Sequence, residues 1–252
     1  MGLHIVFDCT ICGPFCFFKQ MIKKIIPFLV LVFWGNSFVQ AQEYYRFKAD
    51  FSIKEKFVGD EKGQLITGTV YFDKNTRKVY HDIRFPAREK WLNHDTTMYK
   101  VVADTLASKR TTLPFGEFSV YNMILSQQLN DFGLNSGGYD LASVEEGANG
   151  QTTSTWNPKK ELKELLGKVV LMQEQKRVTG VAIYAPTGEL QGKFYFADYQ
   201  MVEDLPVPGK IYQVFYPKET GKEFNRIITY KNIVINQQDE DEVYDFKLPD
   251  LK

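Results

Sequence analysis

A long succession of strand-like segments joined by short turns is the feature that most constrains this chain. Beyond residue 43 these segments are rich in Phe, Tyr, Val and Ile, and several alternate apolar with polar residues. In Arg77–Phe85, one face carries Val79, His81, Ile83 and Phe85. Strands joined by such short links pair as antiparallel neighbours, so the sequence predicts a meander.

We expect strands in two groups of segments. The first group comprises Tyr44–Val58, Gln64–Asp73, Arg77–Phe85, Glu89–Leu92 and Met98–Ala103. The second comprises Lys168–Gln175, Arg177–Ala185, Leu190–Tyr199, Lys210–Tyr216 and Phe224–Ile235, with Val243–Leu248 as a last extended piece. Turn residues predict a break in the sheet at Pro206–Gly209 and an acidic turn at Asp239–Glu242.

Helical patterns separate the two groups. Apolar residues recur at helical spacing, namely Phe115, Phe118, Tyr121, Leu125, Leu129 and Phe132. Pro114 suits the first turn of this helix and Gly133 its end. A second, short helix is predicted between Asn157 as N-cap and Gly167. Strands, helices and more strands predict an α+β fold, a curved antiparallel sheet covered by helices. The apolar space inside is either filled by side chains or open to a ligand.

The segment Met21–Ala41 has the pattern of a secretory signal. A basic start at Lys23-Lys24 precedes the apolar run Ile25–Trp34, and Val39-Gln40-Ala41 places small residues just before Gln42. The apolar run is too short for a permanent membrane-spanning helix. We interpret it as a cleaved signal peptide, with an N-terminal membrane anchor as the alternative. Export would place the protein in the periplasm if the cell is Gram-negative.

Residues 1–20 contain all the cysteines of the chain, at positions 9, 12 and 16. Their spacing is compatible with a metal site, but no fourth cysteine completes a tetrahedral set. We interpret residues 1–20 as a start-site artefact, with translation beginning at Met21. Residues 42–252 then form a single domain without disulfides, because no cysteine lies in them.

Composition and motifs argue against several classes of function. The 31 basic and 31 acidic residues balance, whereas a nucleic-acid-binding domain normally carries a basic excess. The sequence has neither a serine-hydrolase elbow nor a phosphate-binding loop, and His81 and His94 lack the spacing of a helical zinc motif. We therefore predict no catalytic residue, no metal and no cofactor. An enzyme stays open as an alternative class.

Two stretches resemble the periplasmic lipoprotein-carrier superfamily (LolA-like). The first runs from Gly68-Thr69-Val70-Tyr71-Phe72 through a turn to Arg77-Lys78-Val79-Tyr80, and then through Pro86 to Met98-Tyr99. The second comprises Ile228–Asn236, an acidic turn and Tyr244–Pro249. The order of elements between Tyr44 and Leu248 is similar as well.

The resemblance implies an incompletely closed β-barrel with a helical lid, whose apolar interior takes acyl chains of lipoproteins on their way to the outer membrane. The expected partners are an acylated lipoprotein or lipid and membrane-bound donor and acceptor proteins, with the carrier itself a monomer. The family's lid-holding Lys-Arg-Pro is replaced here by Asp73-Lys74-Asn75, and we assign the lid contact to Arg77. Candidate ligand-binding residues are Phe51, Val70, Phe72, Ile83, Trp91, Phe118, Tyr121, Leu125, Phe194 and Phe196. The alternative is an envelope sensor or protein-interaction domain of the same fold.

Overall fold

The computed structural model describes residues 43–94, 97–111, 117–126, 131–147, 150–175, 177–218 and 220–247. The expected signal peptide, the cysteine run and the proposed start site lie outside these residues, as does the side chain of Phe118. All that follows concerns the unit that begins at Tyr44.

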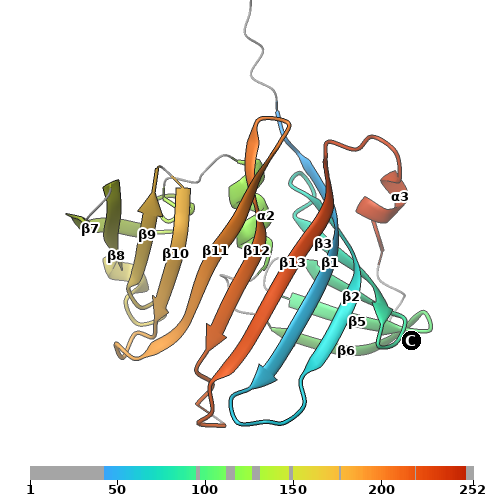
Figure 1. Ribbon diagram of the computed structural model, residues 1–252, viewed down its shortest axis with the longest axis horizontal. Coiled ribbons are helices and arrows are strands. Elements are labelled where there is room, and N and C mark those ends of the chain that lie inside the picture. Colours follow the sequence, from blue (N-terminus) through green and yellow to red (C-terminus); the bar gives the residue numbers. More distant parts are fainter. Residues whose placement is uncertain are drawn as a thin grey trace, which may run out of the picture. The chain divides into compact units, whose positions relative to one another are not determined.

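In the part of the chain that the structure describes, thirteen strands form one antiparallel sheet (Figure 1). The strands are β1 Arg46–Phe57, β2 Gln64–Asp73, β3 Lys78–Phe85, β4 Glu89–His94, β5 Thr97–Val102, β6 Thr105–Thr111, β7 Tyr139–Glu146, β8 Gln151–Pro158, β9 Val169–Glu174, β10 Arg177–Tyr184, β11 Leu190–Val202, β12 Leu205–Phe215 and β13 Phe224–Ile235. Their order is β6-β5-β4-β3-β2-β1-β13-β12-β11-β10-β9-β8-β7. Each strand pairs with its sequence neighbours, except that β6 and β7 do not pair with each other. The pairing of β1 with β13 joins the two ends of the domain. The sheet is curved and does not close, and β6 and β7 form its edges.

Helices contribute little to the described residues. They are α2 (Glu117–Leu125), α3 (Asp241–Tyr244) and a 3₁₀ turn, η2 (Lys160–Leu162). The protein is therefore mostly β, and the predicted α+β fold with a cover of helices was wrong in that respect. None of the helices described is long and apolar enough to cross a lipid bilayer.

The core lies on the face of the sheet that contacts α2, which we call the inner face. Along β1, the alternating residues Phe47, Ala49, Phe51 and Ile53 are all buried on this face. From α2, the ring of Tyr121 packs 5.0 Å from that of Phe47, between centroids. The helix contacts β1 and β12, so it covers the middle of the sheet at one end of these strands.

Strand predictions were confirmed for most segments, and β2 and β13 have the predicted bounds. The sheet break at Pro206–Gly209 was wrong, because these residues begin β12. There β12 pairs with β11, and its pairing with β13 begins only at Lys210. Proline lacks the backbone N–H that would bond to a neighbouring strand. A strand segment that is paired on only one side tolerates it, because its other side needs no such bond.

Strand β6 was missed because its residues are mostly polar and exposed, without an apolar alternation. A tight turn joins it to β5, with Ala103 and Asp104 both in the left-handed region at φ 46° and 57°.

Two further local predictions were wrong. Asn157 lies inside β8 and caps no helix, and the short helix predicted after it is only the turn η2. The expected acidic turn and last extended piece are wrong at Asp241–Tyr244, which form α3 and pack on the outer face of β2 and β3. There the ring of Phe246 stacks 4.9 Å from that of Tyr80, which explains why Tyr80 is buried on the outer face of β3.

Candidate binding cavity

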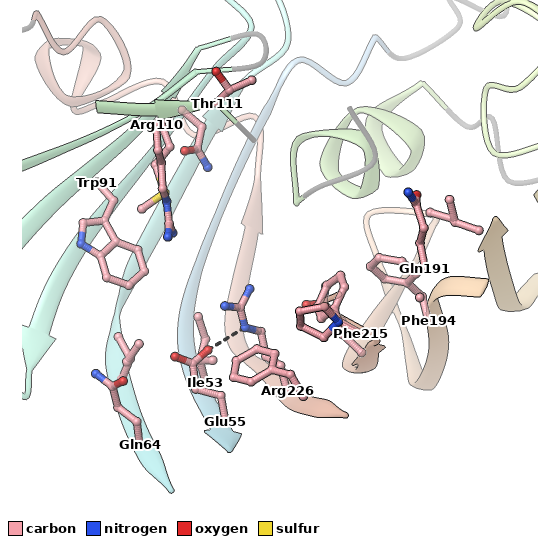
Figure 2. A pocket seen from close by; sticks show the side chains of 18 of the residues that line it. Ile53, Glu55, Gln64, Trp91, Arg110, Thr111, Gln191, Phe194, Phe215 and Arg226 are labelled. Carbon is pink, nitrogen blue, oxygen red and sulfur yellow. Dashed lines mark hydrogen bonds and ion pairs between the residues drawn. The ribbon is translucent and has the colours of Figure 1, made fainter. Parts of the chain in front are cut away.

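A partly open cavity of about 820 Å³ lies on the inner face of the sheet (Figure 2). Small-molecule sites typically measure about 300–1,000 Å³. One wall comes from β2 to β6 and another from β10 to β12, with β1 and β13 between them. The segment 165–167 after η2 also contributes. The cavity therefore follows the curvature of the sheet.

Strand β1 shows how the filled core passes into the cavity. Its inner-face residues from Phe47 to Ile53 are buried, but the next two, Glu55 and Phe57, are only half-buried and line the cavity. Strand β13 repeats the pattern, with Ile228 fully buried and Arg226 and Phe224 in the lining. The apolar space inside the sheet is thus filled near α2 and open at the other end.

Apolar side chains supply much of the lining. Phe224 lies between two other rings, 5.0 Å from Phe57 and 6.3 Å from Phe215. Phe215 in turn packs edge-on against Phe194 at 5.6 Å. Further apolar lining residues are Ile53, Ile66, Ile83, Trp91, Met98, Leu165, Leu166 and Ile183. Such a surface suits an aliphatic ligand, because its burial removes apolar area from water.

Charged side chains lie among these apolar residues. The guanidinium Nε of Arg226 donates to Glu55 Oε2 at 2.7 Å, which is drawn as a dashed line in Figure 2. On the wall formed by β2 to β6, Glu89 accepts from Lys100 Nζ at 2.7 Å and from the indole N–H of Trp91 at 2.9 Å. Burial alone would raise the pKa of Glu89, but the hydrogen bonds from Lys100 and Trp91 together lower this pKa below its ordinary value. Glu89 is therefore ionised and holds the Trp91 ring in place.

Uncharged polar groups also line the cavity. The side chain of Gln213 is 3% exposed, and its Oε1 has no hydrogen-bond partner within the described part of the chain. Asn93 Oδ1 has none there either. Across the described residues, no group of three or more His, Cys, Asp or Glu side chains is placed to hold a metal ion.

The predicted site residues divide into two groups. Ile83, Trp91 and Phe194 line the cavity. The others whose side chains are described lie in the packed core beside it, namely Phe51, Val70, Phe72, Tyr121, Leu125 and Phe196. Arg77 lies exposed in the turn between β2 and β3 at φ 54°. A role of these residues in binding or in holding a lid stays a prediction.

Sequence reasoning missed all the charged lining residues, among them Glu55, Arg110 and Arg226. A signal for Glu55 was present, because it continues the alternation that places Phe47 to Ile53 on the inner face. Arg226 had the same signal, because it continues the alternation of Tyr230 and Ile228 on β13, but the sequence does not show that it pairs with Glu55, 171 residues away. Arg110 lies on β6, which was not predicted as a strand.

Three solved structures have a similar fold. One is a LolA superfamily protein from Nitrosomonas europaea, with a TM-score of 0.55 and 13% identity over 80% of this chain and 91% of that one. A DUF1329 family protein from Desulfovibrio piger gives 0.54 and 16%, over 81% and 91% of the two chains. A putative outer membrane lipoprotein-sorting protein domain from Vibrio parahaemolyticus gives 0.51 and 13%, over 80% and 90%.

Comparisons by sequence add no relative. A scan against protein-family models found no match, and a search of curated proteins found none. The unclosed sheet, its strand order and its structural neighbours agree with the predicted architecture, and the chain has a LolA-like fold.

Proposed function

We propose that this protein is a periplasmic carrier that holds acyl chains of a lipoprotein or lipid in its cavity for transfer towards the outer membrane. The observation that carries the proposal is the open, aromatic-lined cavity next to a filled core. The neighbour from Vibrio parahaemolyticus, described as a lipoprotein-sorting domain, supports the same class of ligand. The secretory pattern of Met21–Ala41 supports export.

The cavity wall gives the physical basis for binding. Each methylene that leaves water for an apolar surface contributes about 0.8 kcal/mol. Affinity should therefore rise with the length of the acyl chain until the cavity is full. In this proposal the protein binds and releases its cargo without chemical conversion, and membrane-bound proteins deliver and receive that cargo. The carrier itself acts as a monomer.

Titration of fatty-acyl probes of increasing length into the delipidated protein tests this function. Saturable binding that strengthens with chain length is the expected result. Ser108→Trp places a large ring in the cavity wall, so this variant should bind less tightly. Lys109→Trp is the matched control, because Lys109 is exposed on the same strand and is not part of the lining.

Absence of saturable binding at every chain length would overturn the carrier function. In that case an envelope sensor or protein-interaction domain of the same fold would be the better interpretation. Equal losses in Ser108→Trp and Lys109→Trp would show that the probe binds elsewhere on the surface.

A further inference from the structure

The charges in the cavity lining do not balance. Two carboxylates, Glu55 and Glu89, face the cavity together with three cations, Lys100, Arg110 and Arg226. Arg226 pairs with Glu55 and Lys100 pairs with Glu89. Among the described residues no carboxylate lies within ion-pair distance of Arg110. The lining therefore carries one surplus positive charge, at Arg110.

The hydrogen bonds of Arg110 leave most of its donors available. Its Nε and one terminal nitrogen, Nη2, donate to the thioether sulfur of Met98 at 3.3 and 3.1 Å. A thioether is a weak acceptor, while a guanidinium has five N–H donors in a fork that fits carboxylate and phosphate oxygens. Arg110 is exposed on edge strand β6, and Figure 2 shows it in the same space as Trp91.

We propose that Arg110 binds the anionic head group of an amphiphilic ligand whose aliphatic chain lies on the apolar lining of the cavity. This inference rests on the proposed function and narrows its ligand to acyl compounds with a carboxylate or phosphate head. The contact with Met98, which is itself 8% exposed, holds the guanidinium against the wall between β5 and β6. The unpaired guanidinium is thereby held at the cavity, where it is also accessible from solvent.

Three probes with the same twelve-carbon chain separate head group from tail: laurate, dodecyl phosphate and the neutral dodecanol. Each is titrated into the delipidated protein at pH 8, with laurate and dodecyl phosphate kept below their critical micelle concentrations and dodecanol below its solubility limit. We expect at least one anionic probe to bind about tenfold more tightly than dodecanol, an advantage that falls as the salt concentration rises. A larger gain in affinity for laurate than for dodecyl phosphate would identify the natural ligand as a fatty acid. A larger gain for dodecyl phosphate would identify it as a phospholipid.

Arg110→Gln should remove this advantage, so that the anionic probes bind this variant no more tightly than dodecanol does. Lys109→Gln is the matched control, since it removes a cation from the neighbouring position. Lys109 lies 5.6 Å from the Tyr99 ring and does not line the cavity, so this variant should keep the preference for anions. Both residues are exposed, and thermal unfolding of each variant confirms that it folds.

The outcomes distinguish this inference from the proposed function. If all three probes bind equally, or if Arg110→Gln keeps the anionic preference, the head-group site is overturned and the acyl-binding function stands. If none of the probes binds, both are overturned. A loss of preference in Lys109→Gln as large as in Arg110→Gln would indicate general surface charge and would also overturn the site.

Discussion

The hydroxyl groups of Tyr121 and Tyr230 lie 2.8 Å apart in the core and join α2 to β13. The Tyr121 side chain is fully buried, and its ring lies 5.7 Å from Phe72 as well as 5.0 Å from Phe47. A buried hydrogen bond within an aromatic cluster fixes the helix to the sheet. This part of α2 is therefore a component of the core rather than a loosely held cover.

A double-mutant cycle on this pair measures how firmly α2 is held. We expect Tyr121→Phe and Tyr230→Phe each to lower the free energy of unfolding by about 1–2 kcal/mol, because each removes a buried hydrogen-bonding group. The double variant should lose less than the sum, with a coupling of about 0.5–1.5 kcal/mol. Urea unfolding of the four proteins provides the measurement. Strict additivity would mean that the two hydroxyls do not interact in solution.

Two predicted ligand residues should respond in opposite ways to substitution by lysine. Trp91 lines the cavity, so Trp91→Lys should weaken acyl-probe binding about tenfold or more and change the melting temperature little. Phe196 is 4% exposed and packs 5.8 Å from Phe132 in the core. Phe196→Lys buries a charge there and should cost several kcal/mol of stability. Probe titration and thermal melts distinguish the two. A stable Phe196→Lys variant with weakened binding would place Phe196 in the cavity instead.

The ion pairs beneath α3 should contribute unequally to stability. Arg46 donates to Asp73 at 3.0 Å, and both side chains are largely buried. Arg46→Met leaves the Asp73 carboxylate without this partner, so we expect a loss of about 3 kcal/mol in the free energy of unfolding. Lys48 pairs with Glu240 nearer the surface, and Lys48→Met should cost about 0–1 kcal/mol. Equal losses in chemical denaturation would contradict this ranking.

Alternation of apolar and polar residues predicts much of the sheet, because a half-buried strand imposes that pattern directly on the sequence. Segments such as Phe224–Ile235 were therefore placed with their observed bounds. Strand β6 could not be found this way, since its exposed residues Thr105–Thr111 carry no such pattern. The prolines at the start of β12 suggested a break because proline usually interrupts a strand that is paired on both sides. The sequence does not show that this part of β12 is paired on one side only.

The cavity was predicted less completely than the sheet. Apolar strand residues identify the inner face, but both Phe51 in the core and Phe194 in the cavity satisfy that criterion. Which of them can contact a ligand depends on how much of the inner face α2 covers. That extent is set by tertiary packing and cannot be read from the sequence of one strand. The pairing of Glu55 with Arg226 likewise depends on the register between β1 and β13, in which these two residues lie opposite each other. No local pattern in either segment specifies that register.

Protonation of Asp50 should lower the free energy of unfolding at acid pH. Its pKa lies below the ordinary value, chiefly because the amide of Asn232 donates to its Oδ2 at 2.9 Å, with further hydrogen bonds from Arg84 and Thr69. Because the folded-state pKa is depressed, the carboxylate stabilises the fold above the unfolded-state pKa of about 3.9. That stabilisation is lost as the pH falls through the folded-state pKa.

Asn232→Gly tests this dependence, because glycine accepts the left-handed conformation of residue 232, at φ 51°, and removes only the amide donor. We expect the pKa of Asp50 to rise towards about 3.9, and the stability of the variant to change less between pH 5 and pH 3 than that of the parent. NMR titration of the carboxyl groups and urea unfolding at several pH values provide the measurements. The pKa of Glu89 serves as an internal control, since its partners Lys100 and Trp91 are unaffected. An unchanged pKa of Asp50 in the variant would show that Asn232 does not stabilise its ionised form.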